Sequence, residues 1–218
     1  MLLQVIFSAF LWVYLDSRFK RLTMKKYSVV LFLLALSIIC GGQSWTKQYD
    51  RVDACNCGLA LVSKNGKFGY VSEQGKVLVP LIYDEAMPFS EDKGAIMMDG
   101  KWGFIDNKGN EFVKPQYSEV YSFHDGLAVV SKGDNYGFID TTGNVAISLR
   151  YTNARSFGAG VAPVSNQKGL WGYIDTNGKE VIPFRFNYAA SFTDSTGRVL
   201  LDSKWYIIDK HGKLTKDE

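Results

Sequence analysis

The sequence predicts an all-β fold built from five tandem repeats of about 34 residues. Aromatic-led pairs mark the register at intervals of 34, 34, 35 and 34 residues: Phe68-Gly69, Trp102-Gly103, Tyr136-Gly137, Trp171-Gly172 and Trp205-Tyr206. A turn glycine follows each pair at a constant distance, at Gly75, Gly109, Gly143, Gly178 and Gly212. A third series reads Cys55, Phe89, Phe123, Phe157 and Phe192. Such a fixed period means that each unit is one supersecondary element that buries its apolar face against its neighbours.

Residues 1–44 contain no repeat and are interpreted as a leader. Within residues 24–44, a basic start, an apolar run of thirteen residues (27–39) and a stretch of small residues form the three parts of a secretory signal peptide. The run is shorter than the about 20 residues that cross a bilayer as a helix. We therefore expect cleavage between Ser44 and Trp45, and we interpret residues 1–23 as a misplaced upstream start.

Two alternatives for the leader remain open. Cys40 follows the apolar run and precedes Gly41, so it resembles the cysteine of a bacterial lipobox, although Ser37 and Ile39 depart from that pattern. Lipidation at Cys40 would anchor the chain to a membrane. A hairpin of two membrane segments, from the apolar runs 1–15 and 27–39, is the other alternative.

The charge of the chain separates the leader from the repeats. The whole sequence has 25 Lys and Arg against 22 Asp and Glu, and the leader holds five of the basic residues and one of the acidic ones. The remaining 20 basic and 21 acidic residues give a formal net charge of −1. No basic surface for nucleic acid is therefore expected. About 174 residues remain, which is the length of one domain.

The third unit shows the expected strands. Short β-rich runs at 127–130, 136–140 and 145–147 alternate with Gly-, Asn- and Asp-rich turns, and an extended return follows at 151–157. This spacing is typical of an antiparallel meander. The units are placed at about 58–91, 92–125, 126–159, 160–194 and 195–214, the last one completed by 45–57.

Two positions indicate how the units pack. A glycine inside a strand, as at Gly69 and Gly103, usually marks the close approach of another backbone or ring, and Tyr206 replaces it in the last unit. Pairing of the N-terminal segment with the last unit would remove exposed sheet edges. We therefore predict a compact five-bladed, propeller-like toroid over 45–218, with an open solenoid of β-hairpins as the alternative.

The core of the unit resembles the bacterial WG-repeat family, also called KWG repeats. Lys101–Asp106 and Trp171–Asp175 match its central motif, and Val181-Ile182-Pro183 matches its usual strand end. The resemblance covers about residues 49–214 and departs at Phe68, Tyr136 and Tyr206, which keep an aromatic ring or the packing role. It implies an exported or surface β-repeat protein without an established activity, and it brings no catalytic residues to this chain.

No catalytic, cofactor or metal site is predicted. His124 and His211 lie in turn contexts, away from any nucleophile with which they could form a triad. The aspartates that open the repeated turns, such as Asp106, are expected to cap backbone N–H groups, because one carboxylate a turn cannot supply the six to eight oxygens of a calcium site. Cys55 stands in a phenylalanine series and is expected to be a buried free thiol.

Function in repeat folds tends to lie where the repeats differ. Tyr121, Arg155 and Tyr188 occupy such variable positions and are the candidate partner-binding residues. We expect a non-catalytic module of the bacterial cell envelope (periplasmic, cell-surface or secreted) that binds a protein or a glycan and no nucleic acid. The alternative is an envelope glycoside hydrolase with carboxylates gathered at a central channel.

Overall fold

The computed structural model describes residues 44–217. Residues from Trp45 onward form one compact unit, and a short 3-10 helix, η1 (Ser44–Gln48), lies at its start. The expected upstream segment 1–23, almost all of the expected signal peptide 24–44, and Cys40 lie outside the described residues. In the described part, no helix has the length and apolar character needed to span a membrane.

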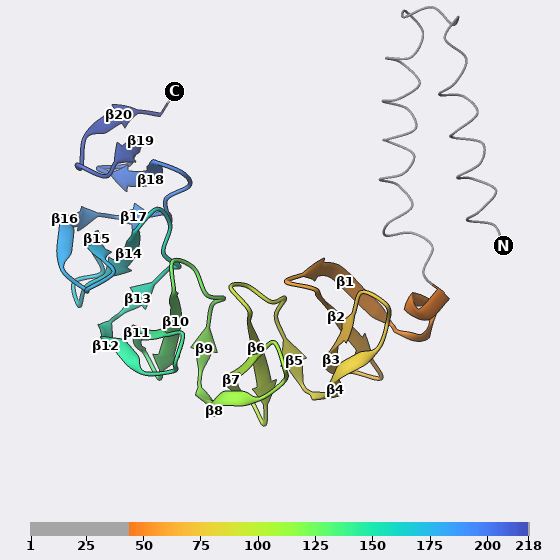
Figure 1. The fold of residues 1–218 in the computed structure, drawn as a ribbon. Coiled ribbons are helices and arrows are strands. Elements are labelled where there is room, and N and C mark those ends of the chain that lie inside the picture. The colour runs from red at the N-terminus through yellow and green to blue at the C-terminus, as the bar shows by residue number, and fades with distance from the viewer. Residues whose placement is uncertain (1–43, 218) are drawn as a thin grey trace, which may run out of the picture. The chain divides into compact units, whose positions relative to one another are not determined.

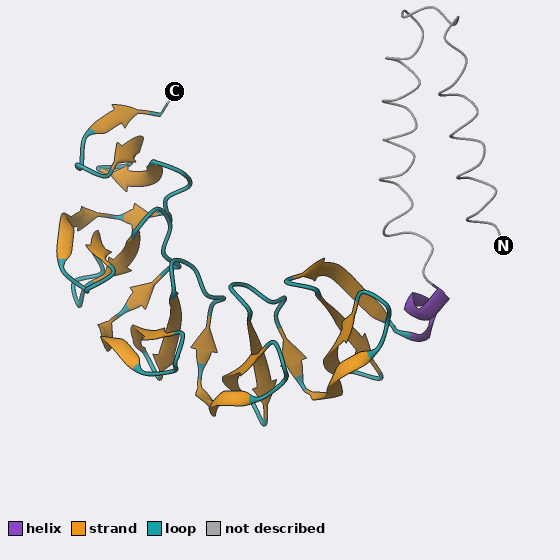
Figure 2. Ribbon diagram, viewed as in Figure 1, coloured by secondary structure: helices purple, strands orange, loops and turns teal. Residues whose placement is uncertain are grey.

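Within residues 44–217, twenty strands form five four-stranded antiparallel sheets, and each sheet takes four strands that are consecutive in the chain (Figures 1 and 2). The first sheet comprises β1 (Arg51–Asn56), β2 (Leu59–Lys64), β3 (Lys67–Ser72) and β4 (Val77–Tyr83). The second comprises β5 (Glu85–Ala86), β6 (Lys93–Met98), β7 (Lys101–Asp106) and β8 (Glu111–Tyr117). The third comprises β9 (Glu119–Val120), β10 (Leu127–Lys132), β11 (Asn135–Asp140) and β12 (Val145–Tyr151).

The fourth sheet comprises β13 (Asn153–Ala154), β14 (Val161–Ser165), β15 (Trp171–Asp175) and β16 (Glu180–Phe186). The fifth comprises β17 (Tyr188–Ala189), β18 (Thr196–Leu201), β19 (Lys204–Asp209) and β20 (Leu214–Lys216). The predicted all-β class and the five meander repeats are confirmed. Sheets of this kind, stacked in chain order, give a propeller-like fold.

The boundaries of the sheets differ from the expected units. The sequence analysis placed 45–57 with the last unit, whereas β1 pairs with β2 in the first sheet, with Val52 opposite Val62. The reason is local: Cys57 and Gly58 have φ values of 52° and 77°, as the central residues of a two-residue hairpin turn require. A two-residue loop costs far less closure entropy than a pairing across the whole chain. The expected completion of the last unit by 45–57 was therefore wrong, and β20 is the outer strand of the fifth sheet.

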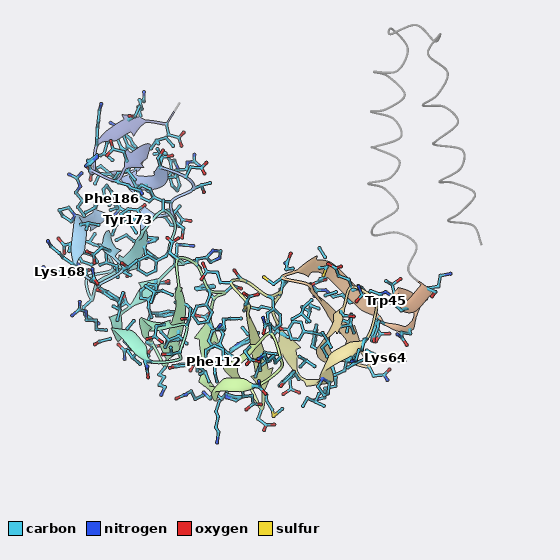
Figure 3. The ribbon with its side chains drawn as sticks, viewed as in Figure 1. Trp45, Lys64, Phe112, Lys168, Tyr173 and Phe186 are labelled. Atoms are coloured by element: carbon cyan, nitrogen blue, oxygen red, sulfur yellow. The ribbon has the colours of Figure 1, made fainter. Side chains whose placement is uncertain are left out.

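Aromatic pairs fill the space between successive sheets. A ring on the third strand of one sheet meets, nearly edge to face, a phenylalanine from the loop between the first and second strands of the next sheet. The four pairs are Tyr70–Phe89, Phe104–Phe123, Phe138–Phe157 and Tyr173–Phe192, with ring centroids 4.7, 5.2, 4.9 and 5.0 Å apart. Each pair adds about 0.5–1.5 kcal/mol beyond the burial of its area. Tyr173 and Phe186 belong to the core that links the fourth and fifth sheets (Figure 3).

Cys55 corrects one expectation. It stands in the phenylalanine series but is exposed, whereas the four phenylalanines are buried. Those phenylalanines pack against an aromatic ring of the preceding sheet, and the first sheet has no sheet before it. The expected buried thiol was therefore wrong.

The fourth strand of a sheet passes so close to its third strand that the third strand needs a glycine at the point of approach. A Cβ added to Gly69, Gly103, Gly137 or Gly172 would lie 2.5–2.7 Å from a backbone carbonyl oxygen of the fourth strand. The strand register shifts at each of these crossings. In the fifth sheet Tyr206 faces Lys216 in a pairing without such a shift, so a side chain fits there. The predicted close backbone approach is confirmed.

The N-terminal turn of helix takes the place of a preceding sheet. The turn glycines Gly109, Gly143 and Gly178 each lie against a Val or Ile side chain of the sheet before them. At Gly75 the neighbour is instead Trp45, whose Cγ would lie 2.3 Å from an added Cβ (Trp45 is labelled in Figure 3). Trp45 and Tyr49 pack against the small core formed by Ala60, Val62 and Val71. These rings cover the outer face of the first sheet.

Candidate binding site

The short first strands of three successive sheets position the candidate residues. Tyr121 directly follows β9 in the third sheet, Arg155 directly follows β13 in the fourth, and Tyr188 begins β17 in the fifth. The backbone N–H of Tyr121 donates to Val129 and that of Arg155 donates to Pro163, both at 3.0 Å. The peptide groups of these residues are therefore fixed to the next strand, and their side chains project from a rigid scaffold.

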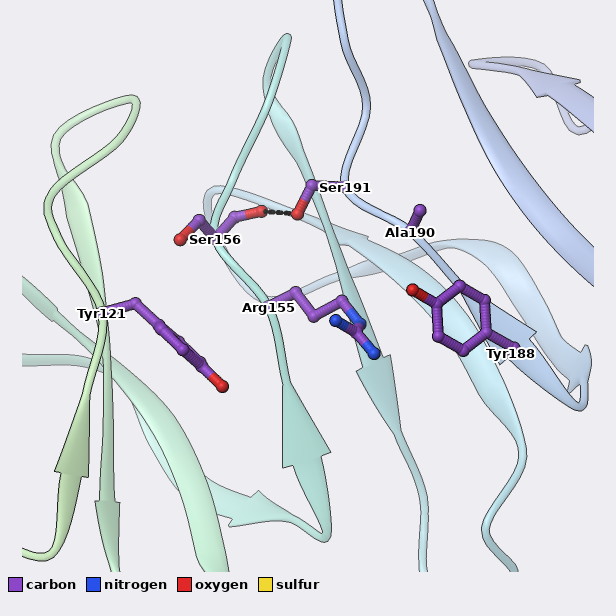
Figure 4. Close-up of a pocket in the computed structure, with 6 residues that line it drawn as sticks. All are labelled: Tyr121, Arg155, Ser156, Tyr188, Ala190 and Ser191. Atoms are coloured by element: carbon purple, nitrogen blue, oxygen red, sulfur yellow. Dashed lines mark hydrogen bonds between the residues drawn. The ribbon is translucent and has the colours of Figure 1, made fainter.

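All three predicted residues line one pocket, which has a volume of about 240 Å³ and is completed by Ser156, Ala190 and Ser191 (Figure 4). Ala190 occupies the register position of Tyr121 and Arg155 in the fifth sheet, because its backbone N–H donates to Arg198 in the same way, at 2.9 Å. Its small side chain leaves room beside Arg155. Figure 4 shows the Arg155 side chain between Tyr121 and Tyr188. The structure thus brings the three residues together, and their role in binding stays a prediction.

Arg155 is held by aromatic rings. Its guanidinium carbon lies 4.7 Å from the centre of the Tyr188 ring and 5.1 Å from that of Trp171. Each such contact stabilises the cation by about 0.5–2 kcal/mol, depending on how far it is removed from water. The buried Nε of Arg155 has no hydrogen-bond partner, and no described carboxylate forms an ion pair with this residue.

The aromatic contacts continue into the fifth sheet. Tyr188 meets Trp205 edge to face with ring centroids 5.6 Å apart, and Arg198 lies 4.4 Å from the centre of the Trp205 ring. Unlike Arg155, Arg198 is neutralised, because its Nε donates to the Asp217 carboxylate at 2.5 Å. We call Arg155, Trp171, Tyr188, Trp205 and Arg198 the arginine–aromatic row.

Hydroxyl groups fix the floor of the pocket. The Ser191 hydroxyl donates to the backbone carbonyl of Ser156 at 2.6 Å, which ties the loop of the fifth sheet to that of the fourth. The Tyr173 hydroxyl donates to the carbonyl of Ala190 at 2.8 Å from beneath. Burial raises the pKa of Tyr173 well above its ordinary value, so it remains a neutral donor.

Sequence reasoning missed two residues of the pocket lining, Ser156 and Ser191, and three residues that pack beside the pocket but outside its lining, Trp171, Trp205 and Arg198. Trp171 and Trp205 were interpreted only as markers of the repeat, and Ser156 and Ser191 were not considered. Arg198 carried a usable signal, because the other units have Leu61, Ala95, Val129 and Pro163 at its position. These four are buried and apolar, whereas Arg198 is exposed. A charge in an otherwise apolar series indicates a changed environment.

Two other surface pockets lie on the described sheets. One, of about 310 Å³, is lined by two carboxylates, Asp99 and Glu111, together with Lys101 and Lys114. The other, of about 270 Å³, has Glu180 as its one carboxylate. Within residues 44–217, no three His, Cys, Asp or Glu side chains cluster closely enough to hold a metal ion. The pocket of Tyr121, Arg155 and Tyr188 has no carboxylate in its lining.

Comparison with solved structures shows similarity of fold. The computationally designed protein Ika8 matches with a TM-score of 0.51 and 13% identity, over 76% of this chain and 60% of its own. Hsv2 of Kluyveromyces lactis matches with a TM-score of 0.50 and 14% identity, over 73% and 59%. The WD40 β-propeller domain of Doa1 matches with a TM-score of 0.42 and 12% identity, over 81% and 69%. The chain thus spans about 60% of the length of the first two structures.

Comparison of sequences identifies the repeat itself. No curated protein matches the chain significantly. The sequence profile of the WG containing repeat matches five consecutive segments, at residues 46–68, 68–102, 102–136, 136–170 and 171–205. This repeat and a propeller-like fold are typical of non-catalytic binding domains. Because the five matches together cover residues 46–205, which is most of the chain, this protein belongs to the family of WG containing repeat proteins.

Proposed function

We propose that this chain is an exported, non-catalytic binding module of the bacterial cell envelope. Its binding site is the pocket between Tyr121, Arg155 and Tyr188, and its partner is a protein or a glycan of the envelope. The observation that carries the proposal is the convergence of these three residues, each from a position where the repeats differ, on one pocket. Pockets with a few convergent polar groups in an aromatic lining are the usual form of a recognition site.

Export is supported by the signal-like segment at residues 24–44 and by the placement of the basic excess in the leader. Cleavage between Ser44 and Trp45 would keep the tryptophan that covers Gly75. Lipidation at Cys40 is the alternative end of the mature chain. Mass spectrometry of the N-terminus of the protein isolated from its native host distinguishes the two, and recovery of residues 1–40 would contradict both.

The binding role is tested by filling the pocket. In Ala190→Trp a large ring enters the space beside Arg155, so retention of an envelope partner by the immobilised protein should fall at least tenfold. The matched control is Asn153→Trp, which adds the same ring to the exposed edge strand β13 outside the pocket lining. Equal retention by wild type and Ala190→Trp, or none by wild type from the envelope fraction, would contradict the proposed site.

A further inference from the structure

We propose that the pocket binds a carboxylated sugar residue of an acidic glycan, whose carboxylate is paired with the guanidinium of Arg155. This inference rests on the proposed binding function and names the chemistry of its ligand. It starts from an imbalance in the arginine–aromatic row: one of its two arginines is neutralised by the protein and the other is not.

Arg198 shows what an arginine of this row binds. Its guanidinium lies over Trp205, and its N–H edge donates to the Asp217 carboxylate. Guanidinium faces stack on rings while the edge donates to carboxylates, so the two contacts are compatible. The Asp217 carboxylate is therefore an intramolecular example of the group that Arg155 lacks.

Arg155 has the same stacking and unused donors. Its faces contact Tyr188 and Trp171, and its side chain donates no hydrogen bond to the described protein. A partly buried cation without a counterion is costly, and a bound anion would offset that cost. The planar fork of the guanidinium favours a planar, two-oxygen acceptor. This selects a carboxylate as the complementary group.

The rest of the lining favours a sugar as the carrier of that carboxylate. Tyr121 is 39% exposed, and its ring stands on the opposite side of Arg155 from Tyr188 (Figure 4). Such rings suit the apolar face of a sugar, and the hydroxyls of Tyr121, Tyr188 and Ser156 can bond to its hydroxyl groups. The volume of about 240 Å³ is below the ~300–1,000 Å³ of pockets for drug-sized ligands, so it suits a single ring.

An acidic peptide fits the surroundings less well. Peptides that add to a sheet need a long free edge strand, because main-chain hydrogen bonds supply their affinity. The strands beside the pocket, β13 and β17, are two residues long each. The pocket therefore accommodates a single ligand group, and the edge strands beside it are too short to hydrogen-bond to the backbone of a peptide.

The test is calorimetry of the purified protein with short oligomers of galacturonate, glucuronate and mannuronate. Three comparison ligands are used: the same oligomers with carboxyl groups reduced to alcohols, a neutral galactose oligomer, and a polyglutamate peptide. We expect at least one uronate oligomer to bind at low salt and to bind more weakly as salt is raised. Arg155→Gln should weaken this binding about ten- to hundredfold, which is the range for a charged hydrogen bond.

The matched control is Arg198→Gln, which removes an arginine with the same stacking but an internal counterion. It should change uronate affinity less than threefold, and circular dichroism of both variants checks that they fold. Equal binding of reduced and carboxylated oligomers, unchanged affinity in Arg155→Gln, tighter binding of polyglutamate, or no uronate binding at all would overturn the inference. If Ala190→Trp still abolishes retention of an envelope partner in such a case, the proposed binding function stands without it.

Discussion

The hydroxyl oxygen of Tyr70 lies 3.1 Å from the place that a Cβ on Gly94 would occupy. Tyr173 and Gly197 stand in the same relationship, at 2.9 Å. Both tyrosine hydroxyls donate to a backbone carbonyl of the next sheet, at 2.7 and 2.8 Å. In the two other junctions a phenylalanine replaces the tyrosine and an alanine replaces the glycine: Phe104 with Ala128, and Phe138 with Ala162. The absent methyl group makes room for the hydroxyl.

This relationship predicts a coupled pair of substitutions. Gly94→Ala should lower the free energy of unfolding by about 1–3 kcal/mol, because the new methyl group crowds Tyr70 and Phe89. Tyr70→Phe alone should cost about 1–2 kcal/mol, because the carbonyl of Met87 loses its donor. The double variant should lose less free energy of unfolding than the two single variants lose together, since it recreates the Phe104–Ala128 arrangement. Urea denaturation of all four proteins measures the coupling, and strict additivity would contradict the packing argument.

The strand glycines give a second prediction. Gly137→Ala should destabilise the protein by about 2 kcal/mol or more, because its Cβ would lie 2.5 Å from the carbonyl oxygen of Ile147. Tyr206→Ala places the same residue at the equivalent site of the fifth sheet, where β20 pairs with β19 without a register shift, and should cost only the lost packing of the ring. The two urea midpoints should therefore differ clearly. A smaller loss in Gly137→Ala than in Tyr206→Ala would count against the crossing-strand explanation.

The repeated turns predict a pH dependence. Asp140 accepts hydrogen bonds from the Thr142 hydroxyl and from the N–H groups of Thr142 and Asn144, and these lower its pKa from the ordinary 3.8. The ionised Asp140 carboxylate stabilises the folded chain at pH values above the ordinary pKa that this group has in the unfolded chain. This stabilisation is lost as the pH falls through the lower pKa that the group has in the folded chain. Hydrogen bonds within their own turns also lower the pKa of Asp106 and of Asp209.

Asp140→Asn keeps an oxygen acceptor but removes the titrating group. Stability of the variant, measured by urea unfolding from about pH 6 to pH 3, should therefore fall less steeply below about pH 4 than that of wild type. Asp134→Asn is the control, because the Asp134 carboxylate makes no hydrogen bond or ion pair with the described part of the chain, and this variant should keep the slope of wild type. An identical slope in wild type and Asp140→Asn would show that Asp140 does not contribute to the loss of stability at low pH.

The sequence predicted the repeat, the strands and the meeting of Tyr121, Arg155 and Tyr188. Tyr121 and Arg155 stand at one repeat position and Tyr188 two residues before the matching Ala190, and residues two apart in an extended chain share one face. The sequence did not predict where a sheet begins. A 34-residue period fits equally well wherever the first repeat is taken to begin, so it does not say which four strands form one sheet. That grouping depends on the Cys57-Gly58 turn, which pairs β1 with β2. The stacking of Arg155 on Trp171 was not predicted, because Trp171 recurs as an aromatic residue in every repeat and was interpreted only as a marker of the repeat.

The N-terminal segment gives the last prediction. Because β1 pairs with β2 and Trp45 covers Gly75, deletion of residues 45–57 should destabilise the first sheet and leave the last one intact. In stacked repeats each unit contacts mainly its neighbours, so the loss should fade along the chain. Hydrogen exchange should show faster exchange in β2 and β3, with unchanged protection in β18 and β19. Trp45→Ala should produce a weaker version of the same pattern, because it removes the covering ring and leaves β1 in place. Equal loss of protection in the first and fifth sheets would instead support a closed ring in which 45–57 joins the two ends.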